Sequence, residues 1–289
     1  MINIEPLVSI GMPVYNGERF IGQALESLLS QDYENFELII SDNASTDNTP
    51  AICKDYMAED RRIRCYKNEQ NLGIVKNFNR VFNLSNGKYF MWAGDHDMWH
   101  PTFISKLVST LEEDPQVVLA YPRTILIDVD GHALMTFPDR IDTRNMAIVQ
   151  RYKQIVKFMG WGNMVYGLIR RDAIARTGNY RNLYFADKVF ISELSLLGTI
   201  AQIDEPLFFR RRNRPPEVGD AHVKSMIYRM DPSNAASSLK RSMWYLISES
   251  HIAFLKGLIS SNIGLREKME LFGFLARFFM ARYIELISS

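Results

Sequence analysis

The feature of this sequence that most constrains its fold is an alternation of short apolar runs with helix-forming segments. The apolar runs have the length and composition of strands buried on both faces, and they lie at 7–13, 36–41, 63–66 and 88–93. Segments with helical spacing or helix-start signals follow them, at 20–29, from Thr49-Pro50 onward, at 74–84 and at 101–113. Because strands that alternate with helices form parallel sheets covered on both faces, we predict an α/β fold with a mixed, mostly parallel sheet flanked by helices.

The rest of the chain has a less regular pattern. We expect further strands at 117–121, 124–128, 165–170 and 207–210, and a helix at 190–198. Residues 214–235 are rich in proline, which is typical of a linker or flexible loop. The pattern is helical from 236 to 289. We therefore predict one domain over 1–213 and a C-terminal helical extension over 236–289.

The composition excludes several classes of protein. Hydrophobic residues make up 47% of the 289 residues, which is enough for a buried core and excludes a disordered chain. The net charge is +1, so we expect no nucleic-acid partner. The two cysteines fit a reducing compartment, and no apolar stretch reaches the roughly 18 residues of a transmembrane helix. We expect a cytoplasmic protein, located at the inner face of the membrane if it contacts one.

Polar clusters follow three of the predicted strands. They are Pro13-Val14-Tyr15-Asn16 after the first strand, residues 41–47 (SDNASTD) after the second, and Gly94-Asp95-His96-Asp97 after the fourth. Parallel α/β sheets bind ligands outside the carboxyl ends of their strands. The three clusters therefore predict one ligand site at that edge of the sheet.

The triplet Asp95-His96-Asp97 gives the sharpest of these signals. Two carboxylates one residue apart on a loop suit a hard divalent cation such as Mg²⁺ or Mn²⁺, which keeps open positions for phosphate oxygens. His96 is either a further ligand or a hydrogen-bond partner. The sequence contains no G-x-G-x-x-G after the first strand, no P-loop and no G-x-S-x-G, which disfavours dinucleotide-binding, kinase and serine-hydrolase functions.

Four segments match a known family in order and spacing: 8–16 (VSIGMPVYN), 36–47 (FELIISDNASTD), 71–73 (NLG) and 87–97 (GKYFMWAGDHD), followed by Pro101. They resemble the inverting glycosyltransferases of family 2, which have the GT-A (Rossmann-like) fold. The likeness is dense over 7–115 and thinner as far as 212. It implies that residues 1–213 are a catalytic domain, with a nucleotide-binding half at about 1–98 and an acceptor half at 99–213.

The resemblance assigns nucleotide contacts to the first two clusters. It implies that Pro13, Tyr15 and Asn16 lie against the nucleotide, and that Asp42 accepts a hydrogen bond from the base, usually uracil. A residue-level alternative for Asp42 is that it only caps its own loop.

The charged candidates are assigned in the same way. Asp95 and Asp97 match the family's Asp-x-Asp element, in which the second carboxylate holds the Mn²⁺ or Mg²⁺ that bridges the diphosphate. His96 is expected in the nucleotide-sugar site, and Lys76 is a basic residue near the stretch where the family often has Ala-Arg-Asn. Arg210 belongs to the basic run 210–212, from which we expect one guanidinium to bind phosphate.

The resemblance places the general base of an inverting reaction on Asp187. This carboxylate would take the proton of an acceptor hydroxyl while the hydroxyl oxygen attacks the anomeric carbon opposite the diphosphate. The alternative is that Asp187 only caps the helix that follows it. Met98 and Ala186 depart from the family pattern, which often has a further Asp at the first position and Glu at the second.

The predicted function is transfer of one sugar from a nucleotide-sugar donor, a UDP-sugar in the leading interpretation, to a hydroxyl of a glycan or lipid-linked acceptor. Such a reaction would serve polysaccharide or cell-surface glycan synthesis. The two departures leave a second interpretation open, a non-catalytic nucleotide-sugar-binding or scaffolding member of the same fold. We expect the apolar segment 271–287 to pack on the catalytic domain, to pair with a second copy, or to lie in a membrane interface.

Overall fold

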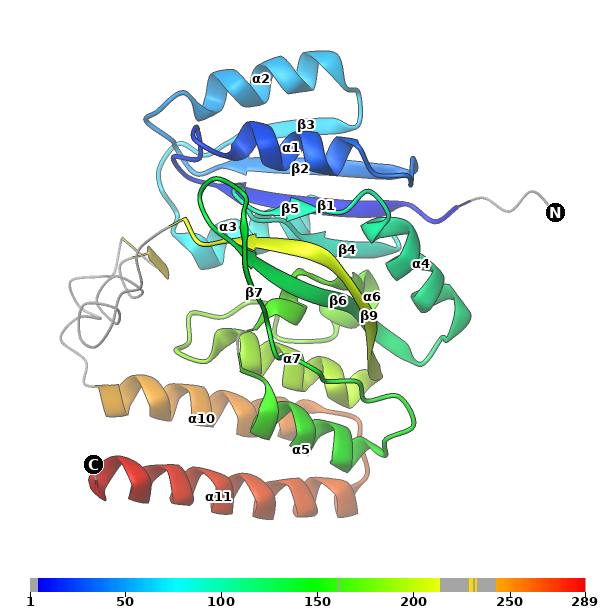
Figure 1. The fold of residues 1–289 in the computed structure, drawn as a ribbon. Helices are drawn as coiled ribbons and strands as arrows, with labels where there is room; N and C mark the ends of the chain where they lie inside the picture. Colours follow the sequence, from blue (N-terminus) through cyan, green and yellow to red (C-terminus); the bar gives the residue numbers. More distant parts are fainter. Residues whose placement is uncertain (1–4, 161, 214–228, 231, 233–242, 289) are drawn as a thin grey trace.

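The computed structural model describes residues 5–160, 162–213, 229–230, 232 and 243–288. Its centre is a nine-stranded mixed sheet with the order β3-β2-β1-β4-β8-β6-β9-β5, in which β7 pairs with β6 outside this path (Figure 1). The strands are β1 (Val8–Val14), β2 (Phe36–Asp42), β3 (Ile63–Lys67), β4 (Tyr89–Trp92), β5 (Met98–Trp99), β6 (Val117–Ile127), β7 (Ala133–Thr136), β8 (Leu168–Arg170) and β9 (Thr199–Arg211). Pairing is parallel for β1 with β2 and β4, for β2 with β3, and for β6 with β9. The predicted mixed, mostly parallel α/β sheet is confirmed.

Helices cover both faces of this sheet. They are α1 (Ile21–Leu29), α2 (Thr49–Glu59), α3 (Ile74–Asn83), α4 (Phe103–Glu113), α5 (Ile148–Phe158), the 3-10 helix η1 (Asn163–Tyr166), α6 (Arg171–Ala175), α7 (Ala186–Leu197), α10 (Met243–Ser260) and α11 (Leu265–Ser288). One buried cluster joins the sheet to α1 and α4, and a second joins its other face to α3, α5 and α7. Side chains alternate between faces along a strand, so the continuous apolar strands supply both clusters.

The structure corrects several predicted elements in the second half. The strands expected at 117–121 and 124–128 are one strand, β6, because Pro122, which has no N–H to donate, lies where the register shifts against β9. The strand expected at 165–170 is η1 followed by the shorter β8. Strand β9 begins at Thr199, eight residues before its predicted start, because pairing with β6 carries it through the polar stretch.

Two helices also differ from the predictions. Helix α7 begins at Ala186, four residues before the predicted start, so Asp187 lies in its first turn. Helix α5 was not predicted. Its apolar residues recur at helical spacing (Ile148, Val149, Tyr152, Ile155 and Val156), so a signal was present in the sequence.

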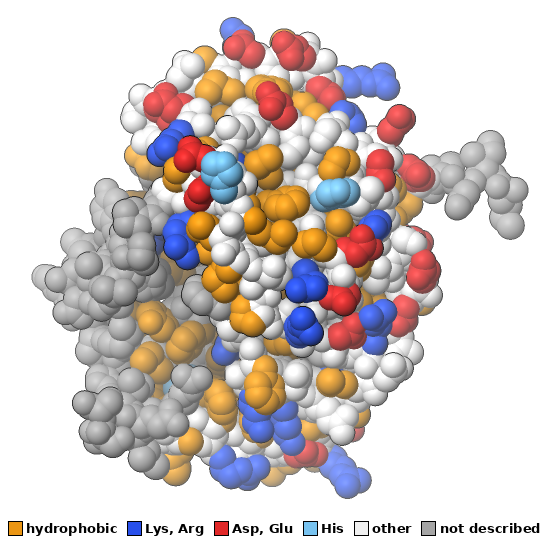
Figure 2. All heavy atoms as spheres, in the orientation of Figure 1, with side chains coloured by type: hydrophobic (Ala, Val, Ile, Leu, Met, Phe, Trp, Pro, Cys, Tyr) orange, Lys and Arg blue, Asp and Glu red, His pale blue; other side chains and the backbone are white. Residues whose placement is uncertain are grey.

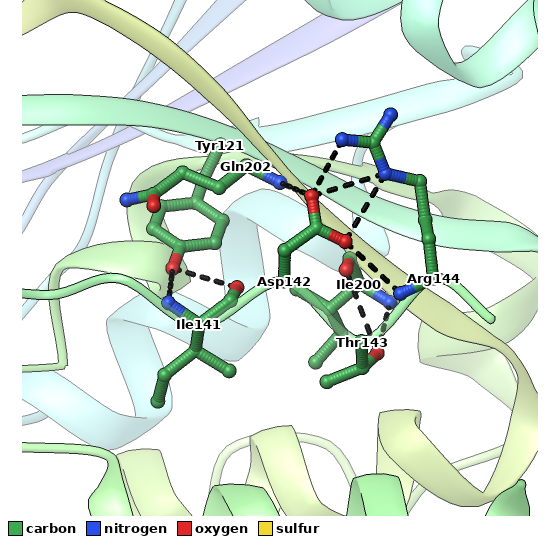
Figure 3. Close-up of polar contacts among 7 residues, drawn as sticks. All are labelled: Tyr121, Ile141, Asp142, Thr143, Arg144, Ile200 and Gln202. Carbon is green, nitrogen blue, oxygen red and sulfur yellow. Dashed lines mark hydrogen bonds and ion pairs between the residues drawn. The ribbon is translucent and has the colours of Figure 1, made fainter. Parts of the chain in front are cut away.

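The segment between β7 and α5 is attached to the sheet by hydrogen bonds (Figure 3). The Tyr121 hydroxyl bonds to both the N–H and the carbonyl of Ile141. Thr143 and Ile200 exchange two bonds of 2.8 Å, from the N–H of Thr143 to the Ile200 carbonyl and from the N–H of Ile200 to Oγ1 of Thr143. These contacts fix a loop that approaches the functional site described below.

The C-terminal helices pack on α5 and α7 through a third buried cluster. Its members include Phe254 and Leu258 of α10 and Leu271 and Leu275 of α11. The segment 271–287 was predicted to pack on the catalytic domain, to pair with a second copy or to lie in a membrane interface. Its buried residues show the first of these, packing on the rest of the chain. The predicted linker 214–235 lies mostly outside the described residues. Among the described residues, we find no helix that is long and apolar enough to cross a membrane.

Candidate active site

A cavity of about 610 Å³ lies at the carboxyl ends of β1, β2, β4 and β9. Its walls come from all three predicted polar clusters and from distant parts of the chain. The lining residues are Pro13, Tyr15, Asn16, Gly17, Arg19, Phe20, Asn43, Asn71, Ile74, Phe78, Ala93, Gly94, Asp95, His96, Tyr166, Tyr180, Arg210, Arg211, Asn213, Arg229 and Pro232. The structure thus brings together Pro13, Tyr15, Asn16, Asp95, His96 and Arg210 from the predicted set.

The turn after β1 is held against the loop after β2. Asn16 has a left-handed backbone (φ 54°), and its side-chain Oδ1 accepts a 2.9 Å hydrogen bond from the N–H of Thr46. The N–H of Asn16 donates to Oγ of Ser45 at 2.9 Å. These bonds leave the neighbouring Tyr15 at the rim, where its ring is 46% exposed. An exposed aromatic ring at the rim of a cavity can stack on a planar ligand.

Asp42 lies beneath this loop and is not a lining residue. Its Oδ1 accepts the N–H of Ser45 at 2.9 Å, which is the loop-capping role considered above. Its Oδ2 is buried and has no hydrogen-bond partner among the described residues. A buried carboxylate oxygen without a donor is costly, so an N–H donor from a ligand would stabilise it. Contact with a nucleotide base stays a prediction for Asp42.

A network of asparagines fixes the next part of the wall. Asn43 Nδ2 donates to Oδ1 of Asn71 at 2.9 Å, and Asn43 Oδ1 accepts from Asn68 Nδ2 at 2.9 Å. Asn68 also donates to Oδ1 of Asn77 at 3.0 Å. Because each amide is satisfied by another, the network holds the 71–73 loop in place without a ligand.

The loop Asp95–Asp97, which we call the acidic loop, holds its residues at different depths. Asp95 and His96 line the cavity, and Asp95 Oδ1 lies 2.6 Å from Nδ1 of His96. Asp97 is only 2% exposed, and its Oδ1 lies 3.9 Å from Nε2 of His96. Burial raises the pKa of Asp97. Burial alone would lower the pKa of His96, but Asp97 and Asp95 outweigh it and raise that pKa.

Two carboxylates and an imidazole within three residues form a donor set that fits Mg²⁺ or Mn²⁺. Among the described residues, the group of this kind whose ligand atoms all lie within 4.8 Å of one another is Asp128, Asp130 and His132. Asp130 and His132 are exposed on the β6–β7 turn. These three residues do not line the cavity, whereas Asp95 and His96 do, so the Asp95–Asp97 loop is the better candidate for a metal that acts on a ligand bound there.

Arg211 fixes the acidic loop through hydrogen bonds. Its backbone N–H donates to Oδ1 of Asp97 at 2.9 Å, and its Nε donates to the carbonyl of His96 at 2.9 Å. Its Nη atoms donate to the carbonyl of Val129 at 2.7 Å and to Oε1 of Gln23 at 2.8 Å. One arginine of the run 210–212 is predicted to bind phosphate, and Arg211 supports the acidic loop while it also lines the cavity.

Arg210 points the other way from Arg211, as neighbours on a strand do. Its Nη1 donates to Oδ1 of Asn163 at 2.7 Å, and its guanidinium lies over the Phe137 ring at 5.9 Å. Arg210 lines the cavity and opposes the burial effect that raises the pKa of Asp187 to about 6. Asp187 is partly buried and is not itself a lining residue.

Tyr166, which no sequence pattern singles out, also lines the cavity. Its ring packs against Phe208 at 5.6 Å. Burial raises the pKa of Tyr166, and the carboxylates of the acidic loop and of Asp187 act in the same direction. Nothing in the local sequence distinguishes this tyrosine, because only the η1 turn brings it to the site.

Lys76, one of the predicted contacts, lies away from the cavity, and so does Trp99. Lys76 is exposed on α3, on the side opposite Ile74, because two residues turn a helix by about 200°. Ile74 and Phe78 of the same helix do line the cavity. Trp99 is 3% exposed and packs against Phe208, so it belongs to the core.

The fold and site define an α/β protein that binds its ligand at the carboxyl edge of its sheet. The family model described as Glycosyl transferase family 2 matches residues 9–182, more than half of the chain. The chain therefore belongs to glycosyl transferase family 2 and is a glycosyltransferase. The predicted family is confirmed.

Individual relatives agree with this assignment. The chain is 27% identical over 247 residues to an uncharacterized glycosyltransferase of Haemophilus influenzae, with 82% of this chain and 72% of the relative covered. It is 37% identical over 113 residues to the putative glycosyltransferase EpsE of Bacillus subtilis, with 39% and 41% covered. The chain thus spans less than half the length of EpsE.

Solved structures show the same fold. The chain superposes on S. aureus TarS residues 1–349 in complex with UDP with a TM-score of 0.62 and 16% identity, covering 90% of this chain and 68% of that one. The mannosyltransferase PcManGT from Pyrobaculum calidifontis, in complex with GDP-Man and Mn²⁺, gives a TM-score of 0.54 and 14% identity, covering 99% and 84%. The predicted GT-A fold is confirmed by these likenesses.

Proposed function

We propose that the chain is an inverting glycosyltransferase that moves one sugar from a nucleotide-sugar donor to a hydroxyl of a glycan or lipid-linked acceptor. The leading candidate for the donor is a UDP-sugar. The observation that carries the proposal is the cavity into which the β1 turn, the 71–73 loop, the acidic loop and the end of β9 all project. The TarS complexes contain UDP and UDP-GlcNAc, and the PcManGT complex contains GDP-Man, which supports a nucleotide-sugar site.

Asp187 is the proposed general base. A base works best when its pKa lies near the working pH. Burial raises the pKa of Asp187 to about 6, so the carboxylate is ionised at neutral pH and still basic enough to take a hydroxyl proton. Asp187 lies in the first turn of α7, and Arg210 counters its negative charge.

Asp95 and Asp97 are the proposed metal ligands. A bound Mg²⁺ or Mn²⁺ would neutralise charge that develops on the departing diphosphate. The chain itself contributes the fixed position of the loop, which Arg211 sets, and the cation of Arg210, which also lines the cavity. The Mn²⁺ in the PcManGT complex supports a divalent metal here.

A melting experiment tests the proposal. We would measure the melting temperature with UDP, GDP and dTDP, each with and without Mn²⁺. A ligand at about 100 times its Kd adds about 2.7 kcal/mol of stability, which raises the midpoint of a chain near this size by roughly 5–11 °C. A shift in melting temperature that requires both nucleotide and metal supports the donor site. It also identifies which nucleobase the donor carries. No shift with any of the three nucleotides contradicts the proposal.

Contact of the C-terminal helices with a membrane or with a second copy stays a prediction. Several large apolar side chains of these helices are exposed, namely Ile252, Ile259, Leu265, Met269 and Met280. Figure 2 shows Lys and Arg side chains gathered at the end of the molecule where α5 and α11 lie. Flotation with anionic vesicles tests the membrane contact, and sedimentation of the free chain tests the dimer.

A further inference from the structure

One short turn between α5 and β8 contacts both of the groups that the proposed function needs. It consists of Gly162 and η1. Gly162 has a left-handed backbone (φ 70°), and a Cβ on it would lie 2.5 Å from Oδ2 of Asp187. The next residue, Asn163, accepts a hydrogen bond from Arg210. The turn therefore fixes the positions of Asp187, the proposed base, and Arg210 relative to each other.

The amide of Asn163 is bonded at both ends. Asn163 is 2% exposed, its Oδ1 accepts from Nη1 of Arg210 at 2.7 Å, and its Nδ2 donates to Oδ2 of Asp139 at 2.8 Å. An ionised carboxylate only accepts hydrogen bonds, so Asp139 holds the NH₂ end of the amide. The carbonyl end must then face Arg210. The orientation of Asn163 is thus decided by Asp139.

Asp139 is itself fixed by the sheet. Its backbone carbonyl accepts a 2.7 Å hydrogen bond from Nε2 of Gln202 in β9. The residues that follow it, Ile141 to Thr143, are attached to β6 and β9 by the contacts drawn in Figure 3. A continuous series of hydrogen bonds therefore runs from β9 through Asp139 and Asn163 to the guanidinium of Arg210.

A guanidinium recognises phosphate oxygens well only when its planar set of donors is held at the right angle. Arg210 is held on one side by Asn163 and lies over the ring of Phe137. On the basis of the proposed function, we propose that Asn163, oriented by Asp139, is a positioning residue that aims Arg210 at the diphosphate of the donor. Asn163 does not itself line the cavity, so it acts through Arg210.

The test compares four variants of the full chain, Asn163→Ala, Arg210→Ala, the double variant of these two, and Asn83→Ala. Asn83 is an exposed residue at the far end of α3 and serves as the matched control. Calorimetry would give the Kd for UDP with Mn²⁺, or for GDP or dTDP if one of these shifts the wild-type melting temperature instead. We expect N163A to raise the Kd about tenfold, as for one lost charge-assisted hydrogen bond, and N83A to leave it unchanged.

The double variant separates positioning from a general effect on the fold. If Asn163 acts through Arg210, then N163A changes the Kd little when Arg210 is already Ala. Equal effects of N163A in both backgrounds, or an unchanged Kd in N163A, overturn the inference. A wild-type chain that binds none of the three nucleotides overturns the proposed function as well, so the two failures are distinguishable.

A rescue experiment covers the case in which N163A does not fold. In the exchanged pair D139N/N163D, the new amide can donate to the new carboxylate, which still accepts from Arg210. N163D alone places two carboxylates side by side. We expect the pair to bind within about threefold of wild type and N163D to bind about tenfold more weakly. A pair that binds no better than N163D overturns the inference.

Discussion

The backbone N–H of Arg211 donates a 2.9 Å hydrogen bond to Oδ1 of Asp97, a residue that precedes it by 114 positions. This bond joins β9, the last strand in the chain, to the acidic loop that follows β4. The side chain of Arg211 adds bonds to the carbonyls of His96 and Val129, so it also joins the loop to the β6–β7 turn. The loop that we propose to bind metal is therefore shaped before any ligand arrives.

We predict that Arg211→Ala destabilises the protein strongly. The substitution leaves the carbonyls of His96, Asp128 and Val129 without the guanidinium that bonds to them. The expected loss is about 3 kcal/mol, or roughly 6–12 °C in melting temperature. The matched control is Arg212→Ala, because the neighbouring Arg212 side chain is exposed. Equal melting temperatures for the two variants would contradict this role.

We predict that turnover depends on the ionisation of Asp187. Burial raises the pKa of this carboxyl to about 6, and only the ionised form can accept a proton. The rate should therefore be level above pH 7 and fall about tenfold per pH unit below pH 6. Asp187→Asn should lower kcat about 10³-fold and leave the Kd for nucleotide nearly unchanged. If this variant also bound nucleotide much more weakly, the assignment of Asp187 as the general base would be contradicted.

We predict that Gly162→Ala impairs catalysis more than nucleotide binding. The new Cβ would stand 2.5 Å from Oδ2 of Asp187, so the carboxylate must move. Gly131 provides a matched control, because it also has a positive φ (91°) but has no atom within 4 Å of the position of its Cβ. Both variants carry backbone strain of about 1–2 kcal/mol, and only G162A should also lose kcat. Similar kcat values for G131A and G162A would show that the contact is unimportant.

We predict that the metal-dependent part of nucleotide binding requires the acidic loop. Asp97→Asn keeps an oxygen that accepts the N–H of Arg211, so the fold should survive, but the variant loses the charge that a divalent cation needs. The melting shift that Mn²⁺ adds to the nucleotide shift should disappear. Asp130→Asn, in the other acidic group, should keep that shift. The opposite pattern would assign the metal to the β6–β7 turn.

Much of the fold could be predicted because its signals are local. The first four strands appear in the sequence as short apolar runs, and the structure has them at β1, β2, β3 and β4. Helix α4 was predicted for the same reason, since its buried residues recur at helical spacing. The polar clusters were also placed correctly, because the carboxyl ends of parallel strands must meet at one edge.

The elements that were predicted wrongly depend on distant partners. Pro122 does not end its strand, because a register shift against β9 absorbs it. Strand β9 extends through polar residues that would not form a strand alone, because β6 on one side supplies its hydrogen bonds. These contacts are decided by residues about 80 positions away, which no local pattern records.

The sequence by itself determined which residue types gather at the site: aromatic and amide groups after β1, carboxylates after β4, and arginines at the end of β9. Only the tertiary structure decided what each one does. Arg210 and Arg211 are alike in sequence, but neighbouring side chains on a strand point to opposite faces. Arg211 therefore meets the acidic loop while Arg210 meets Asn163, whose amide is held in turn by Asp139, a residue 24 positions earlier in the chain.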